Sequence, residues 1–307
     1  MATLLTWDEI VASTLDSDAS IREDLQDAIY NVSPYDTPLL SRLRQVAVKN
    51  QFTQWQTDSF RAAAGNAMIE GIAFTAKNVT VPSRASNITQ LFYESGSVSD
   101  VQRDVAHAGM DDPLSYYESK KLVELKKDIE LAILKGSAIT GTTSTAMRMS
   151  GFMNAISTNN TNLSGATLTE TVFGNLLQLG WSNSDVQPTE VYVGPNLKRT
   201  ISNYSTRVTP FIDAASKKQI LTVSQYESDF GIVSVHIHRE LTNGTANNQM
   251  LVIDPNWFAT GWLQTLKREI MPRDGLRVNF QISCNLTLLF RHEAAAIAVS
   301  NASYYIP

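Results

Sequence analysis

The chain has 307 residues, of which 25 are Lys or Arg and 30 are Asp or Glu, so its formal net charge is −5 at pH 7. With 43% hydrophobic and 18% charged residues, the composition is that of an ordinary globular protein, not of a disordered or fibrous one. The single Cys excludes an intramolecular disulfide. The net negative charge argues against a protein whose main function is to bind nucleic acid through its phosphates. No transmembrane helix and no signal peptide is expected.

Residues 1–45 are predicted to form an arm with little core of its own. Ser20-Ile21-Arg22-Glu23 is a capping box that indicates a short helix. The pairs Ser33-Pro34 and Thr37-Pro38 then interrupt it, because the residue before a proline avoids the α region. The segment buries little by itself, so we expect it to lie on another surface.

Residues 46–98 are predicted to form a long hairpin that projects from the body. The residues around Trp55 follow the two-residue period of a strand, and a return strand is predicted from about Ser86 to Ser97. A hairpin with so few large apolar residues cannot form a core of its own. It should be either mobile or packed on another molecule.

The strongest helix signal covers Pro113–Lys135. Asp112 supplies the N-cap, and Gly136 stands where the helix should end. Apolar residues recur on one face, and the helix would be about 35 Å long. Two pairs at i,i+4 spacing are expected on its outer side: Lys120 with Glu124, and Lys126 with Glu130.

The middle of the chain, residues 151–263, alternates helix and strand signals and predicts a compact α/β unit. A capping box at Thr167–Glu170 begins a helix that is expected to stop at Gly180. The other expected elements are strands at Glu190–Val193, Ile232–His238 and Met250–Asp254, and a helix at Pro195–Tyr204.

The most regular pattern is at Leu276–Phe290, where every even position is apolar and the odd positions are polar except for Leu289. This alternation predicts a strand approaching 50 Å in length, well above the usual 17–20 Å or so. It matches the long helix in reach, so a helix laid on an elongated sheet is the expected arrangement. The fold class is therefore predicted to be α+β.

No catalytic, cofactor-binding or metal-binding residue is predicted, and the chain is expected not to be an enzyme. His292-Glu293 begins like a zinc-protease helix but lacks the second His. His236 and His238 share a strand face and could hold a metal, but no third ligand is in view and the sequence favours an exposed strand surface. Cys284 falls on the apolar face of the long strand, as a small core residue would. The lysines of the long helix could face nucleic acid, but the interleaved acids favour a solvated surface.

Several short segments stand in a characteristic order along the chain, beginning with Asp24–Pro38 and continuing almost to the end of the sequence. The further segments are Trp55–Asp58, Asn66–Gly71, Lys126–Glu130, Arg148–Gly151, Val193–Pro195, Asp254-Pro255 and Asn285–Ala296. Together they resemble the major capsid (major head) proteins of tailed double-stranded-DNA bacteriophages.

The resemblance implies the tailed-phage major capsid fold. The expected division is an N-terminal arm at 1–45, an extended loop at 46–98, a peripheral domain at 99–150 and 264–307, and an axial domain at 151–263. By this resemblance the spine helix of the peripheral domain is the long helix predicted above, laid on the elongated sheet.

The function implied by the resemblance is self-assembly into hexamers and pentamers of an icosahedral head, located in the virion capsid after assembly in the host cytoplasm. Expected partners are copies of the chain, double-stranded DNA held by weak non-specific contact, and portal, scaffolding or decoration proteins, with no membrane. Arm and loop would lie across neighbours, which would cover residues that no intramolecular core can take. These are Trp55, Phe52, Tyr30 and Leu39.

Three alternatives stay open at this point. A cellular nanocompartment (encapsulin-like) shell protein would share the fold but enclose protein cargo. A metal-dependent hydrolase would use His236, His238 and His292. A minor head or decoration protein would be present in low copy number.

Overall fold

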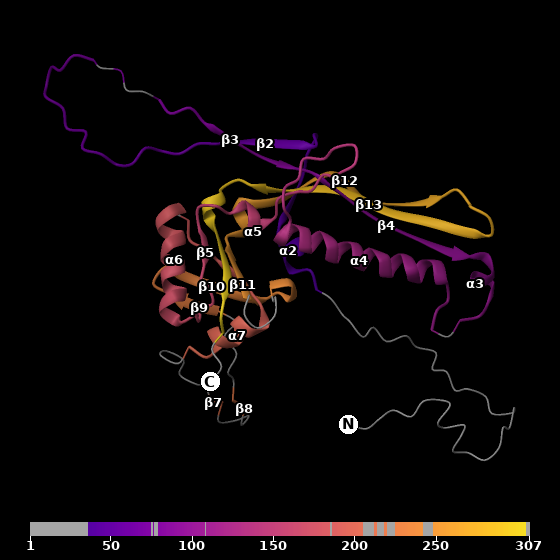
Figure 1. Ribbon diagram of the computed structural model, residues 1–307. Helices are drawn as coiled ribbons and strands as arrows, with labels where there is room; N and C mark the ends of the chain where they lie inside the picture. The colour runs from indigo at the N-terminus through magenta and orange to yellow at the C-terminus, as the bar shows by residue number, and fades with distance from the viewer. Residues whose placement is uncertain are drawn as a thin grey trace.

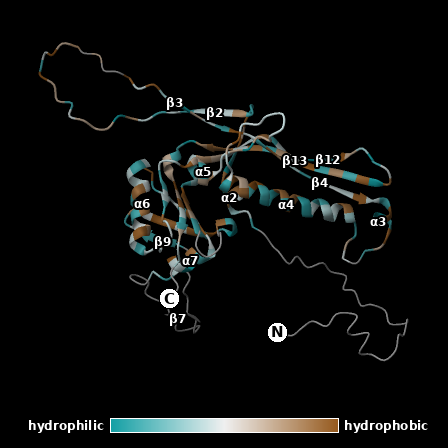
Figure 2. Ribbon diagram, in the orientation of Figure 1, coloured by the Kyte–Doolittle hydropathy of each residue, from teal (hydrophilic) through white to brown (hydrophobic). Residues whose placement is uncertain are grey.

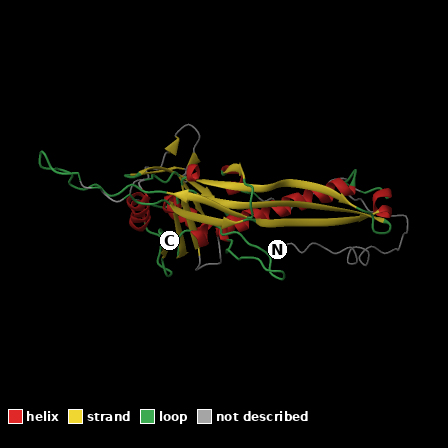
Figure 3. Cartoon of the chain, turned by 90° about the horizontal axis from the view of Figure 1, so that it is seen from above, coloured by secondary structure: helices red, strands yellow, loops and turns green. Residues whose placement is uncertain are grey.

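The computed structural model describes residues 36–74, 76, 79–107, 109–184, 186–204, 212–213, 218–219, 225–241 and 248–304. Two sheets organise these residues, one with four strands and one with six. Figure 1 shows the longer, four-stranded sheet extending to one side of the molecule, and Figure 3 shows a loop extending to the opposite side. The predicted capping box at Ser20–Glu23 and most of the predicted arm lie outside the described residues.

The four-stranded sheet carries the long helix on one face, as predicted (Figure 1). The helix is α4 (Pro113–Lys135), and the strand predicted from its alternation is β13 (Arg277–Phe290). Along β13 the even positions are buried, because they face α4. In spatial order the strands are β1 (Arg44–Ala47), β12 (Phe258–Met271), β13 and β4 (Gln90–Ser99).

The ends of α4 are those predicted, but one of its faces is not. The Asp112 carboxylate accepts hydrogen bonds from the backbone N–H groups of Leu114 and Ser115, and Gly136 is the C-cap. Lys121, not Lys120, pairs with a glutamate of the outer face. The predicted outer pair of Lys126 with Glu130 is wrong, because Glu130 points inward and is fully buried.

The six-stranded sheet contains the strands predicted in the middle of the chain. Helix α6 (Glu170–Ser184) continues past Gly180, where the sequence predicted its end. A Cβ atom at Gly180 would lie 2.7 Å from Ile297 Cδ1, so this glycine lets the helix approach the sheet closely and does not end it. In spatial order the strands are β5 (Asn160–Asn162), β14 (Ala296–Ala302), β11 (Asn248–Ile253), β6 (Glu190–Val193), β10 (Gly231–Ile237) and β9 (Gln225–Ser228).

The sheets divide the chain differently from the expected boundary at 263/264. Strand β12 begins six residues earlier, at Phe258, and belongs to the long sheet over its whole length. Strand β14 leaves that sheet and pairs with β11, so residues 296–302 belong to the six-stranded sheet. Neither strand shows alternation: most of β12 is exposed, and β14 is largely a continuous buried run, which is why periodicity did not reveal them.

The predicted hairpin is present, but shorter than expected. Strand β2 (Phe52–Thr57) pairs with β3 (Ser83–Ile88) in antiparallel register. The strand is interrupted at Thr89, and the chain then continues into the long sheet as β4. The predicted return strand therefore belongs only partly to the hairpin. Shorter elements complete the described chain: α2 (Pro38–Arg42), α3 (Asp100–Asp104), α5 (Phe152–Ala155), α7 (Pro195–Ser202), β7 (Ile212–Asp213), β8 (Lys218–Gln219), η1 (Arg239–Leu241), η2 (Pro255–Trp257) and η3 (Glu293–Ala295).

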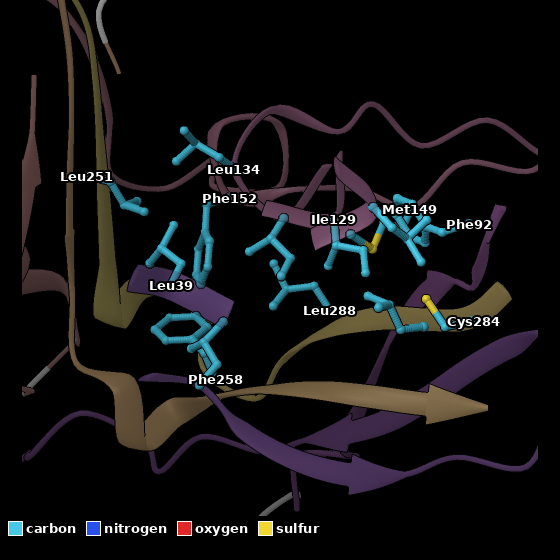
Figure 4. Close-up of a cluster of buried hydrophobic side chains, with 14 of the residues drawn as sticks. Leu39, Phe92, Ile129, Leu134, Met149, Phe152, Leu251, Phe258, Cys284 and Leu288 are labelled. Carbon is cyan, nitrogen blue, oxygen red and sulfur yellow. The ribbon is translucent and has the colours of Figure 1, made fainter. Parts of the chain in front are cut away.

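Two hydrophobic clusters hold the body together. The larger lies between α4 and the long sheet and extends to α5 and to the six-stranded sheet, from which it includes Tyr192, Leu251 and Ile253. Within it the Phe152 and Phe258 rings meet edge to face with centroids 5.1 Å apart (Figure 4). The second lies between the six-stranded sheet and α6 and α7. No helix among the described residues combines the length and apolarity needed to span a membrane.

Candidate assembly surface

Between β2 and β3 lie residues 58–82, and those of them that the structure describes extend away from both clusters (Figure 1). Many of these described residues are large and apolar, and the ribbon is brown at such residues in Figure 2. Their side chains are exposed. Phe60 is fully exposed, and Phe74 is 93% exposed. The set, called the loop patch below, is Phe60, Met68, Ile69, Ile72, Phe74, Val79 and Val81.

The loop patch is unusual for a chain that stays alone in water. Burying one such side chain fully is worth about 1.5–3 kcal/mol, so the patch represents a large unused driving force. Single exposed apolar residues are ordinary, but several large ones exposed along a single loop indicate an interaction surface. The patch is therefore the strongest candidate interaction surface of the described chain.

The root of the hairpin, in contrast, is fixed to the body by one buried side chain. Asn87 donates through Nδ2 to the carbonyl oxygens of Leu288, at 2.8 Å, and Ser150, at 3.1 Å. Its Oδ1 accepts from the backbone N–H groups of Ser150 and Ile88. One amide thus joins β3 to β13 and to the segment after α4.

Two further bonds hold the same root. Thr287 Oγ1 donates to the Ile88 carbonyl oxygen at 2.9 Å, and Thr89 N–H donates to the Gln51 carbonyl oxygen at 2.9 Å. The base of the hairpin is therefore set by the body, while the large apolar side chains described within 58–82 are exposed.

The four residues that were expected to be covered by neighbours have different surroundings. Phe52 is half exposed, and Trp55 is half buried against the main cluster. Leu39 is completely buried within that cluster, so the expectation for Leu39 is wrong (Figure 4). Leu39 is part of the short helix α2, which packs on α4, and this packing within the chain covers its side chain. Tyr30 lies outside the described residues.

The histidines named for a metal site have separate partners. His238 is buried and its Nε2 lies 2.8 Å from Glu130 Oε1, while His236 stacks on Tyr192 and His292 Nε2 lies 3.1 Å from the Ser184 carbonyl oxygen. The described residues hold no group of three or more His, Cys, Asp or Glu side chains placed to bind a metal ion. Burial raises the pKa of the Cys284 thiol to about 12, so the thiolate is scarce at neutral pH.

Glu293, which follows His292, supports a turn. Its carboxylate accepts from Thr158 N–H and Thr158 Oγ1, both at 2.8 Å, and from Ser157 N–H. Burial opposes ionisation, but the hydrogen bonds to Thr158 and Ser157 outweigh it and lower the pKa of Glu293 below its usual value.

Sequence reasoning missed the loop patch because its apolar residues follow no helical or strand period and stand among Ala and Gly. The usable signal was their density between two turn-rich boundaries, not their spacing. It also missed Asn87, because no local pattern distinguishes a buried, fully bonded Asn from the many exposed ones.

The fold of the chain is similar to the folds of solved shell proteins. The capsid of a native GTA particle superposes with a TM-score of 0.68 over 95% of this chain and 99% of that chain, at 12% sequence identity. The SrpI encapsulin of Synechococcus elongatus superposes with a TM-score of 0.61, over 91% of this chain and 95% of that chain, at 10% identity. These structures establish the fold, and the predicted tailed-phage capsid fold is confirmed.

The sequence identifies the family within that fold. Residues 8–303 match the model of the SU10 major capsid protein family, and the chain belongs to that family. The major capsid protein of Escherichia phage Phieco32 is 33% identical over 110 residues, which are 36% of this chain and 31% of that relative. The matched region is thus less than a third of the length of the phage protein.

Proposed function

We propose that the chain is the self-assembling shell subunit of a tailed-phage head, forming hexamers and pentamers that close into an icosahedral capsid. The observation that carries this proposal is the loop patch: large apolar side chains on a hairpin with a fixed root, in a member of a major capsid protein family. Each contact can be weak, because every subunit makes several of them.

The domain roles follow the two sheets. The four-stranded sheet with α4 would be the peripheral domain, and the six-stranded sheet with α6 and α7 the axial domain near the centre of each capsomer. Residues 52–88 would be the extended loop, and the residues before Pro38 the arm. Strand β14 would belong to the axial domain.

The partners in this proposal are copies of the chain, double-stranded DNA inside the shell, and portal, scaffolding or decoration proteins. A net charge of −5 suits a container that holds DNA without gripping it. The role would be structural and not catalytic, and its location the virion capsid, after assembly in the host cytoplasm.

A nanocompartment shell is the second candidate, because the encapsulin named above covers nearly the same share of this chain. The two functions differ in content: DNA in a phage head, and protein cargo in a nanocompartment. The contents of purified particles decide between them.

The test uses the full chain expressed alone and particles purified from infected cells. Negative-stain microscopy of wild type should reveal closed particles or capsomers. The triple variant Phe60→Ser, Ile69→Ser, Phe74→Ser should remain folded but fail to close shells, whereas Arg61→Gln in the same loop should assemble normally. A wild-type chain that stays monomeric under all assembly conditions would contradict the proposal, as would normal shells from the triple variant.

A further inference from the structure

The short helix α2 is joined by polar contacts to α4, which packs on the long sheet, and to the six-stranded sheet. It begins at Pro38, and its N-cap residue Thr37 makes no side-chain capping bond. The free N–H groups of its first turn point into the body instead. They meet a carboxylate that comes from another element, 91 positions away in the sequence.

That carboxylate belongs to Glu130 of α4, which is fully buried. Its Oε1 accepts from Leu39 N–H and its Oε2 from Leu40 N–H, each at 2.8 Å. A carboxylate at the N-terminal turn of a helix satisfies donors that the helix cannot pair itself. Glu130 therefore caps α2 from the outside.

Glu130 also contacts the end of the other sheet. His238 follows β10 directly, and its Nε2 lies 2.8 Å from Glu130 Oε1. His238 Nδ1 accepts from Glu240 N–H, so the proton of the neutral ring is on Nε2 and is donated to Glu130. Both ring nitrogens are thereby used, with the ring only 1% exposed.

The opposite end of α2 is held by a second glutamate, from the six-stranded sheet. Arg42 Nε donates to Glu190 Oε1 at 2.5 Å, and Glu190 Oε2 accepts from the Tyr192 hydroxyl at 2.8 Å. Glu190 is nearly buried, whereas Arg42 is largely exposed. Tyr192 then contacts His238 edge to face, which closes the set of contacts.

We propose that α2 is a clip that fixes the angle between the two sheets. Glu130 belongs to the unit of the long sheet, and Glu190 and His238 to the six-stranded sheet. A rotation of one sheet against the other must break a contact at one end of α2 or the other.

The burial of these groups gives the clip two discrete states. A buried carboxylate that loses its donors is costly, so partial loosening is unfavourable and the clip is either closed or open. If the proposed shell function holds, positions in pentamers and hexamers that need different sheet angles would differ here. The clip itself is a property of the single chain, so it can be tested without assembly.

Amide hydrogen exchange of the full chain tests the clip. In Glu130→Gln the amides of Leu39 and Leu40 should lose protection about tenfold or more, because bonds to a charged acceptor are lost. Residues 238–241 should lose protection with them, while β13 should change by less than about twofold. Asp128→Asn, at an exposed carboxylate of the same helix, is the matched control and should leave all these segments unchanged.

Arg42→Gln is a second way to release α2, and it leaves the buried carboxylate of Glu130 unchanged. It should also reduce protection in α2, and its combination with Glu130→Gln should add little, because one released end already opens the clip. Unchanged exchange of Leu39 and Leu40 in both variants would overturn the proposal. So would an equal loss of protection in α2 and β13, which would mean general destabilisation. Monomeric wild type would count against the shell function alone.

Discussion

The long sheet and the loop between β2 and β3 use large apolar residues in opposite ways. In the sheet, the even positions of β13 face α4 and are removed from water within one chain. In residues 58–82, side chains of the same kind remain exposed, although the root of the loop is firmly bonded. The first region completes its own core, and the second has apolar surface that none of the described residues covers.

Under the proposed function, the sheet folds the subunit and the loop joins subunits. Changes in the sheet should alter stability, and changes in the loop should alter association with little effect on stability. The expected stability losses of four substitutions outside the loop are given below, from the largest to the smallest, for comparison with changes in the loop.

The largest effect is expected for Phe280→Asp. Phe280 is 1% exposed on the helix-facing side of β13, so the change removes a ring from the core and buries an unpaired charge. The expected loss is about 5 kcal/mol or more, measured by chemical denaturation. Phe280→Leu should lose much less, and equal denaturation midpoints for wild type and the Asp variant would place this face outside the core.

Asn87→Ala should come next, with a loss of about 2–3 kcal/mol. The change leaves the backbone groups of Leu288 and Ser150 without the partner that holds the hairpin root. The exposed Asn160→Ala in β5 is the control and should be neutral. If both variants denature at the same midpoint, Asn87 does not hold the root.

Gly96→Ala should cost about 1–3 kcal/mol. A Cβ atom there would lie 2.5 Å from Phe280 Cζ, and the ring is packed too tightly to move away freely. Gly65→Ala, in the loop, has no atom within 4 Å of the added carbon and should change nothing. This pair compares sheet and loop directly, and an equal response of the two glycines would contradict the contrast between them.

The smallest effect is expected for Glu293→Gln, and it should depend on pH. The folded state lowers the pKa of Glu293 below its ordinary value of 4.5, so its stabilisation is present above that pH. The stability difference between wild type and variant should be constant near neutral pH and shrink as pH falls below about 4.5. Denaturation midpoints measured from pH 3 to pH 7 check this, and a difference independent of pH would contradict it.

Local patterns predicted those elements whose residues obey one period. Alternation identified β13 and capping signals identified α4, because each element buries one regular face. Gly180 was misread because a glycine that allows close packing looks the same in sequence as one that ends a helix. Glu130 was misread because its burial depends on α2, whose position no local pattern encodes.

The candidate site was predictable only in part. A projecting hairpin followed from its lack of core residues, but its apolar tip did not, because aperiodic hydrophobic residues carry no structural signal of their own. Leu39 was assigned to a neighbour for the same reason: its cover comes from elements distant in sequence. What a surface residue contacts in an assembly is a property of several chains and not of one.

Hydroxyl-radical footprinting tests most directly whether the loop patch is covered by other copies. Labelling of Phe60, Met68 and Phe74 should be strong in dissociated subunits and fall severalfold in assembled particles, while buried Phe280 stays unlabelled in both. Equal labelling of the patch in subunits and particles would contradict the account, because the apolar residues would then remain in water after assembly.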